Sequence, residues 1–122
     1  LAAIRGHAAF ADAPNLFPTA PIGAIRQLMP RTGWRLDEVE LFEINEAFAV
    51  VAMVAMRELG LDHARVNVHG GACALGHPIG ASGARILVTL LAALHSHGLR
   101  RGVAAICIGG GEATAVAVER LD

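Results

Sequence analysis

Lysine and tyrosine are both missing from the 122 residues, and each absence excludes a class of chemistry. All ten basic residues are arginines, so the chain can form no Schiff base and offers no lysine to a phosphate-binding P-loop. Without tyrosine, no phenolic acid is available. The only two cysteines are too few for a disulfide framework, so a reducing compartment, the cytoplasm, is the simpler expectation.

The chain also lacks strong charge and long apolar runs. Its net charge of −1 argues against a nucleic-acid or anionic-membrane surface, since both require clustered positive charge. No apolar run reaches the roughly 18 residues of a membrane span, and the first residues lack the basic and apolar regions of a signal peptide. We therefore expect neither a nucleic acid nor a membrane among its partners.

What the chain does contain is apolar side chains, which make up 54% of its residues. This content predicts extensive burial and argues against disorder. A length of 122 residues is enough for one domain, residues 1–122, with a modest core. The first residue is leucine rather than methionine, so we expect a fragment or a processed piece of a longer protein.

Short β-like runs alternate with helical runs along the chain. Strands are predicted at residues 2–11, 40–45, 66–69, 102–108 and 113–120, and helices at about 19–29, 46–59 and 84–97. Pro30 is expected to end or kink the first helix. The order βαβαβαββ predicts an α/β fold, with helices packed on a mixed, five-stranded and mostly parallel sheet. The short glycine connection between the last two strands favours an antiparallel pair.

In such sheets the functional loops lie beyond the carboxyl ends of the strands. Three loops qualify here, and they contain Asn45–Phe48, Gly76–Pro78 and Cys107–Gly111. Because the strands before the first two loops enter crossover helices, these loops should lie at the same edge of the sheet. The third loop follows a strand that we infer to be parallel to them.

His77 is the first candidate for chemistry. It lies between Gly76, which permits a sharp turn or the close approach of a ligand, and Pro78, which suits the first turn of a helix. An imidazole at a helix N-terminus and at the carboxyl edge of a sheet can donate a hydrogen bond or shuttle a proton. A capping or packed histidine is the alternative, and the residues alone do not decide between the two.

Cys107 is the second candidate, because it ends an apolar strand and precedes the glycine run Gly109–Gly111. Backbone N–H groups freed in such a turn can form an oxyanion hole, since no side chain blocks the approach. A thiol at this position could act as a nucleophile or as a general base and acid. An inert buried cysteine beside a hairpin turn is the alternative.

Asn45 stands where the second predicted strand becomes a helix. It could cap that helix, or it could position a water molecule or polarise a carbonyl group. The residue by itself leaves both possibilities open. Glu46, next to it, is expected to be a first-turn acid that the helix dipole favours.

The other candidate sites are weaker. Cys73 and His77 are four residues apart, but the loop offers no further ligand at metal spacing, so we expect no metal site. The glycines of this loop lack the dinucleotide-binding spacing, which leaves a nucleotide-binding module resting on the glycine content alone. Ser82 does not lie in a G-x-S-x-G nucleophile elbow.

In this order and spacing, the three loops resemble the carboxyl-terminal signature blocks of the thiolase family. The blocks are Asn45–Phe48, the segment Asn67–Arg85 and Cys107–Gly111. The related ketoacyl synthases typically carry histidine where Cys107 stands, so Cys107 favours a thiolase. The resemblance extends over the whole of residues 1–122 and implies the fold of a thiolase carboxyl-terminal domain.

The resemblance implies an acyltransferase that catalyses the reversible Claisen condensation, or thiolytic cleavage, of 3-ketoacyl-CoA. The residue matching His77 would activate a nucleophilic cysteine and contribute to an oxyanion hole. The residue matching Asn45 would hold a water molecule that completes this hole. The residue matching Cys107 would move a proton at the substrate α-carbon or on the departing group, and the N–H of Gly109 would belong to a second oxyanion hole.

The resemblance also implies what the chain needs from elsewhere. The nucleophilic cysteine and the loop region that grips CoA belong to an amino-terminal half that this sequence lacks, and Cys73 does not substitute for that nucleophile. The expected partners are this half, acyl-CoA and CoA, and further copies in a dimer or tetramer. CoA would be a substrate, and no cofactor is expected. The alternative is a non-catalytic thiolase-like scaffold or subunit domain, which the set Asn45, His77 and Cys107 disfavours.

Overall fold

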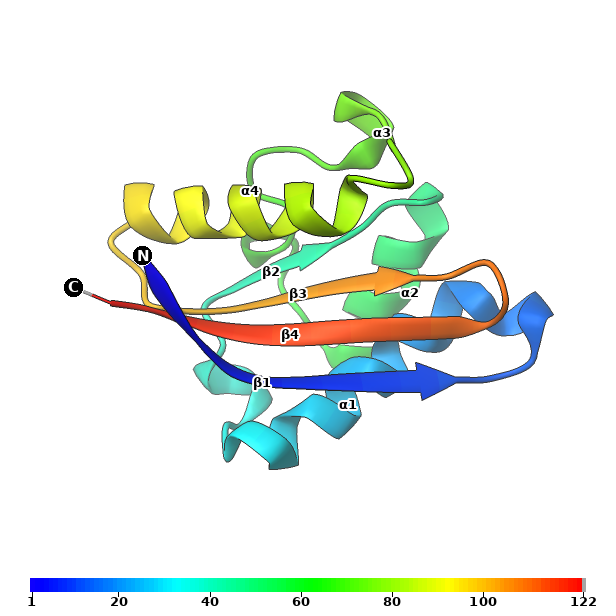
Figure 1. Cartoon of the computed structure of the whole chain (residues 1–122), viewed down its shortest axis with the longest axis horizontal. Helices are drawn as coiled ribbons and strands as arrows, with labels where there is room; N and C mark the ends of the chain where they lie inside the picture. Colours follow the sequence, from blue (N-terminus) through cyan, green and yellow to red (C-terminus); the bar gives the residue numbers. More distant parts are fainter. Residues whose placement is uncertain (122) are drawn as a thin grey trace.

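The computed structural model describes residues 1–121, which form a four-stranded sheet with helices on both faces (Figure 1). The strands are β1 (Ala2–Ala11), β2 (Leu41–Ile44), β3 (Arg101–Cys107) and β4 (Glu112–Arg120). The α-helices are α1 (Ala20–Thr32), α2 (Ala49–Leu59), α3 (Ala72–Leu75) and α4 (Ser82–Ser96). Short 3₁₀ helices lie at Pro14–Thr19, Leu36–Glu38 and His63–Arg65.

The strands lie in the order β1-β4-β3-β2. Strands β2 and β3 are parallel, whereas β4 runs antiparallel to both β1 and β3. The mixed α/β architecture and the antiparallel last pair are therefore confirmed, but the expectation of a mostly parallel sheet is wrong, because β1 pairs with β4. Since β2 and β3 are parallel, the loops after Ile44 and Cys107 leave the sheet at the same edge, as predicted.

Side chains alternate across the sheet, so each strand contributes to two layers. Phe42 and Ala105 belong to a core shared with α1 and α2, whereas Leu41 and Ala104 belong to a second core beneath α4. Figure 1 shows α4 along one face of the sheet and α1 and α2 on the other. Helix α4 packs closely against β3 at Gly102, where a Cβ would lie 2.8 Å from Cδ1 of Leu90.

The fifth strand predicted at residues 66–69 is wrong. Val66 forms a single parallel bridge with Phe42, and the backbone then turns at Asn67, whose φ is 50°. The side chain of Asn67 takes over the pairing with Ile44. Its Oδ1 accepts a hydrogen bond from the N–H of Ile44 at 2.8 Å, and its Nδ2 donates to the Ile44 carbonyl at 2.9 Å. A side-chain amide thus occupies the place of the next peptide group.

Pro30 does not end α1 where the sequence predicted. The helix continues to Thr32 and ends at Gly33, which has a left-handed φ of 72°. Proline lacks an N–H, so the helix loses the bond to the carbonyl of Arg26, which is a small loss this close to the end of the helix. The hydroxyl of Thr32 donates to the Met29 carbonyl at 2.9 Å and so satisfies one of the last carbonyl groups.

Helix α4 is 15 residues long and carries its buried residues at helical spacing. Ile86, Leu90 and Leu94 lie in the core between this helix and the sheet. The helix begins at Ser82, two residues before its predicted start, and this brings Ser82 into a fully buried position. None of the helices in residues 1–121 is long and apolar enough to cross a membrane.

Candidate active site

A cavity of about 440 Å³ lies at the edge of the sheet where β2 and β3 end. Three of the residues predicted from the sequence line it: His77, Cys107 and Gly109. The rest of its lining is apolar and consists of Phe17, Ala47, Phe48, Ile79, Ile106 and Ile108. A mostly apolar cavity with a few convergent polar groups is the usual form of a small-molecule site. The fourth predicted residue, Asn45, is buried and contacts His77.

His77 reaches the cavity from the segment between α3 and α4. Helix α3 ends at Gly76, whose φ of 93° and ψ of 163° form a backbone conformation that glycine alone adopts readily. The carbonyl of Pro78 then accepts hydrogen bonds from the N–H groups of Ala81 at 2.7 Å and Ser82 at 2.8 Å. The glycine turn and the start of α4 therefore hold the imidazole on both sides.

The imidazole of His77 contacts the hydroxyl of Ser82. The hydroxyl of Ser82 donates to the Pro78 carbonyl at 3.0 Å, so its single proton is already engaged. The same oxygen lies 2.5 Å from Nδ1 of His77 and, with its proton on the Pro78 carbonyl, accepts from an N–H at Nδ1. A neutral ring protonated in this way presents an unprotonated Nε2, which is the form required of a general base.

Asn45 continues the sheet beyond β2, because its N–H donates to the Ala105 carbonyl at 2.9 Å. Its side-chain Nδ2 lies 3.4 Å from Nε2 of His77, and its Oδ1 accepts from Nη2 of Arg85 at 3.4 Å. Since α2 begins only at Ala49, the alternative of Asn45 as the cap of that helix is wrong. The amide is instead a neighbour of the imidazole.

Glu46 also precedes α2, so its prediction as a first-turn acid is wrong. Its carboxylate accepts hydrogen bonds from Nδ2 of Asn67 at 3.0 Å and from the N–H of Cys73 at 3.0 Å. Burial raises the pKa of Glu46, but the hydrogen bonds from Cys73 and Asn67 outweigh it and leave the pKa below its ordinary value. Glu46 thus ties the loop that leads to His77 to the end of β2.

Cys107 ends β3 and is 8% exposed. Burial raises the pKa of its thiol, which keeps the thiol protonated at neutral pH and able to donate a proton. Gly109 is exposed, and a Cβ there would meet no atom within 4 Å. Within residues 1–121 the N–H of Gly109 donates to no backbone carbonyl, so it is free to stabilise an oxyanion.

A buried ion pair behind the site was missed by the sequence analysis. Glu43 of β2 is 2% exposed, and its Oε2 lies 3.9 Å from Nη1 of Arg85 on α4. Burial raises the pKa of Glu43 to about 7, while the positive charge of Arg85 acts in the opposite direction. The burial of Glu43 could have been anticipated, because alternate side chains of a strand point to the same side of the sheet. Glu43 therefore points to the same side as the apolar Leu41.

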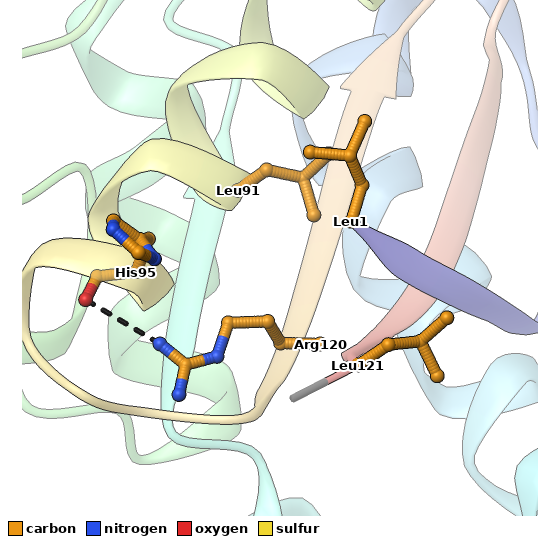
Figure 2. Close-up of a pocket in the computed structure, with 5 residues that line it drawn as sticks. All are labelled: Leu1, Leu91, His95, Arg120 and Leu121. Carbon is orange, nitrogen blue, oxygen red and sulfur yellow. Dashed lines mark hydrogen bonds between the residues drawn. The ribbon is translucent and has the colours of Figure 1, made fainter.

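A second cavity, of about 300 Å³, lies beside α4 at the end of the sheet where β3 begins and β4 ends (Figure 2). It is lined by Leu1, Leu91, His95, Arg120 and Leu121. Arg120 donates to the main-chain carbonyl of His95 at 3.4 Å, as the dashed line in Figure 2 shows. None of the residues predicted from the sequence lines it, so the cavity beside His77 is the candidate active site.

A known family matches almost the whole chain. The family model described as "Thiolase, C-terminal domain" matches residues 1–120. The chain belongs to the thiolase family. The matched region contains both the cavity and the buried pair behind it.

Acetyl-CoA acetyltransferases of an animal and a bacterium are similar to this chain in sequence. The cytosolic acetyl-CoA acetyltransferase of Mus musculus is 56% identical over 107 residues, which are 88% of this chain and 27% of that protein. The probable acetyl-CoA acetyltransferase of Escherichia coli K12 is 50% identical over 120 residues, or 98% of this chain and 30% of that protein. The chain thus spans less than a third of the length of these relatives.

A solved structure shows the same fold. The acetyl-CoA acetyltransferase of Bacillus anthracis superimposes with a TM-score of 0.97 at 42% identity, covering 99% of this chain and 31% of that one. The predicted thiolase-like α/β fold is therefore confirmed, with four strands in place of five.

Family membership assigns no role to a single side chain. The functions of Asn45, His77, Cys107 and Gly109 stay predictions, although all four lie together as expected. In residues 1–121, three or more histidine, cysteine or acidic side chains do not gather in a way that could hold a metal ion. The expectation of a site without metal or cofactor also stays a prediction.

Proposed function

We propose that this chain is the part of a thiolase of the acetyl-CoA acetyltransferase type that supplies its acid–base and oxyanion groups. The observation that carries this proposal is the convergence of His77, Cys107 and Gly109 on one cavity. They offer a basic nitrogen, a protonated thiol and a free N–H. These are the groups needed to form or break a carbon–carbon bond beside a thioester carbonyl.

In the first half-reaction, an acyl group moves to a cysteine that the rest of the enzyme supplies. As the sulfur of this cysteine attacks the thioester carbonyl carbon, Nε2 of His77 exchanges its long contact with Nδ2 of Asn45 for the proton of the cysteine. The resulting imidazolium N–H then faces the developing oxyanion, together with a water molecule that Asn45 helps to hold. The carbon–sulfur bond to CoA breaks, and the departing CoA thiolate takes the proton of Cys107.

In the second half-reaction, the thiolate of Cys107 removes a proton from the α-carbon of a second acetyl-CoA. The N–H of Gly109 stabilises the enolate oxygen that forms. The carbanion attacks the carbonyl carbon of the acyl-enzyme, and the bond from that carbon to the cysteine sulfur breaks. The released cysteine thiolate recovers its proton from His77, so every group returns to its starting state with acetoacetyl-CoA and CoA as products.

The rim of the cavity supports completion of the site by another part of the enzyme. Phe48 is 61% exposed, Ile79 84% and Ile108 50%, and all three line the cavity. Apolar side chains gathered around a polar site are typical of a surface that another protein segment covers. We propose that this segment is the amino-terminal half of the thiolase, which carries the nucleophile.

The same proposal covers cofactors, location and assembly. Preorganised donors and a nearby base suffice for this condensation, so we expect no metal or redox cofactor, and CoA thioesters serve as substrates. The word "cytosolic" in the names of the mouse and rat relatives supports a cytoplasmic location. A dimer or tetramer of the complete enzyme stays an expectation from the family.

A chimera tests the proposal. The matched 120-residue part of the Escherichia coli relative is replaced by this chain, and cleavage of acetoacetyl-CoA by CoA is measured. We expect the chimera to turn over, whereas this chain alone and the Escherichia coli protein without its matched part should not. A folded chimera without activity would contradict the proposal and favour a non-catalytic scaffold. Substantial cleavage by the isolated chain would contradict the missing nucleophile.

A further inference from the structure

The ion pair of Glu43 and Arg85 has no part in the proton transfers proposed above, yet it lies directly behind them. Both carboxylate oxygens of Glu43, and Nε and Nη1 of Arg85, are buried without a hydrogen-bond partner in residues 1–121. The pair is held by charge attraction across 3.9 Å. Removing two charges from water without full hydrogen bonding is costly, so such a pair adds little to stability and its retention calls for another role.

We propose that Arg85 is a positioning residue that fixes the amide of Asn45 and, through it, the tautomer of His77; this rests on the proposed function. A guanidinium carries donors only, so the amide atom that faces it across 3.4 Å must be Oδ1. Nδ2 of Asn45 then faces His77, also at 3.4 Å. Because an amide nitrogen only donates, Nε2 of His77 must be unprotonated.

Ser82 is compatible with the same tautomer on the other side of the ring, but its hydroxyl can accept from or donate to Nδ1 and does not fix the tautomer by itself. With its own proton donated to the Pro78 carbonyl, its oxygen accepts from Nδ1 of His77. Donation therefore runs consistently through the set, with Arg85 donating to Asn45, Asn45 to His77, His77 to Ser82 and Ser82 to Pro78. Turning the amide over would place its NH₂ group against the guanidinium, where two sets of donors would face each other, and its Oδ1 against Nε2 of His77, which would then need a proton.

The secondary structure explains why these residues meet. Leu41, Glu43 and Asn45 alternate along β2 and its extension, so all three side chains leave the sheet on the side of α4. Ser82 and Arg85 are three residues apart on α4 and lie on one face of that helix. β2 and its extension therefore carry Glu43 and Asn45. Helix α4 carries Arg85, which contacts Asn45, and Ser82, which contacts His77.

The tautomer can be measured directly by long-range ¹H–¹⁵N correlation spectra of the chain labelled with ¹⁵N-histidine. For the neutral ring of His77 in the wild-type chain we expect a proton on Nδ1 and none on Nε2. A wild-type spectrum with the proton on Nε2 would overturn the proposal without any variant, so the test does not depend on the folding of a mutant.

Variants then isolate the contribution of Arg85. Arg85→Met should give a mixture of the two tautomers of His77. Arg85→Lys keeps the charge and the hydrogen-bond donors, so it should retain the Nδ1–H form. The matched control is Arg120→Met, because Arg120 is another partly buried arginine that contacts carbonyls of α4, at Leu94 and His95. An unchanged tautomer in Arg85→Met would overturn the proposal.

Kinetics of the chimera separate this inference from the proposed function. Arg85→Met should lower kcat on the order of 10-fold to 10²-fold with little change in KM, because the ring is misplaced while the substrate surface is intact. Unchanged kcat in Arg85→Met would contradict the positioning role. Loss of all activity in the wild-type chimera would instead contradict the proposed function, and the tautomer measurement would still decide the role of Arg85.

Discussion

The hydroxyl of Ser82 lies 2.5 Å from Nδ1 of His77 and donates its own proton to the carbonyl of Pro78. This relationship makes a fully buried serine an anchor for the imidazole rather than a nucleophile.

Ser82→Ala removes both the acceptor for the imidazole N–H and the donor to the Pro78 carbonyl. We expect the free energy of unfolding to fall by about 1 kcal/mol, the usual net contribution of a hydrogen bond, since the Pro78 carbonyl keeps the N–H groups of residues 81 and 82. The tautomer of His77 should stay Nδ1–H, because Arg85 and Asn45 are unchanged. Urea denaturation and histidine NMR check the two effects. Ser96→Ala, on the same helix but at its exposed end, is the control, and an equal loss of stability there would contradict the account.

Replacement of Glu43 should change how stability depends on pH. Burial raises the pKa of Glu43 from 4.5 to about 7, in a site where Arg85 and Glu46 are the neighbouring charges. The folded state therefore holds this proton more tightly than the unfolded chain. Its stabilising effect is complete below pH 4.5 and is lost as the pH rises to about 7, a change of roughly 3 kcal/mol.

Glu43→Gln cannot ionise and should lack this change. Relative to the wild-type chain, the free energy of unfolding of Glu43→Gln should therefore increase by up to roughly 3 kcal/mol between acidic and mildly alkaline pH. Urea denaturation of both proteins across this range provides the measurement. A constant difference between the two proteins would show that Glu43 titrates normally.

Removing the carboxylate of Glu46 should loosen the loop before His77. Glu46→Ala leaves the N–H of Cys73 and Nδ2 of Asn67 without their acceptor, so the amide hydrogen of Cys73 should exchange faster with solvent. In the wild-type chain the same loosening should occur as the pH falls below the ordinary carboxyl range, because the pKa of Glu46 is lowered and its contribution is lost on protonation.

Hydrogen exchange followed by NMR measures this loosening at Cys73. Glu58→Ala, which removes an exposed carboxylate on α2, is the control and should leave the exchange rate of Cys73 unchanged. Equal protection of Cys73 in Glu46→Ala and the wild-type chain would contradict the role of Glu46 in holding this loop.

Most of the fold was predictable because hydrophobic periodicity and glycine positions act locally. The apolar runs now assigned to β2 and β3 and the glycines after α2 and α4 were sufficient to place these elements. Residues 66–69 were not, because the pairing of Asn67 with Ile44 passes through a side chain. No propensity scale distinguishes such an amide from the next residue of a strand.

The part of the candidate site that lies next to glycine turns was predictable. His77 and Cys107 stand beside glycines at the carboxyl edge of the sheet, and local sequence is enough to mark such positions. Arg85 and Ser82 were not predicted as parts of the site, because their contacts depend on which face of α4 meets β2. That register is set by packing across the sheet, which a single sequence does not reveal.

The most direct test of the account is the turnover of the chimera carrying His77→Ala or Cys107→Ala, with folding of each variant confirmed. We predict that each substitution lowers the rate of acetoacetyl-CoA cleavage by about 10²-fold or more, as expected for the loss of a general acid–base group. Near-normal turnover of either variant would contradict the assignment of that residue to the chemistry of the cavity.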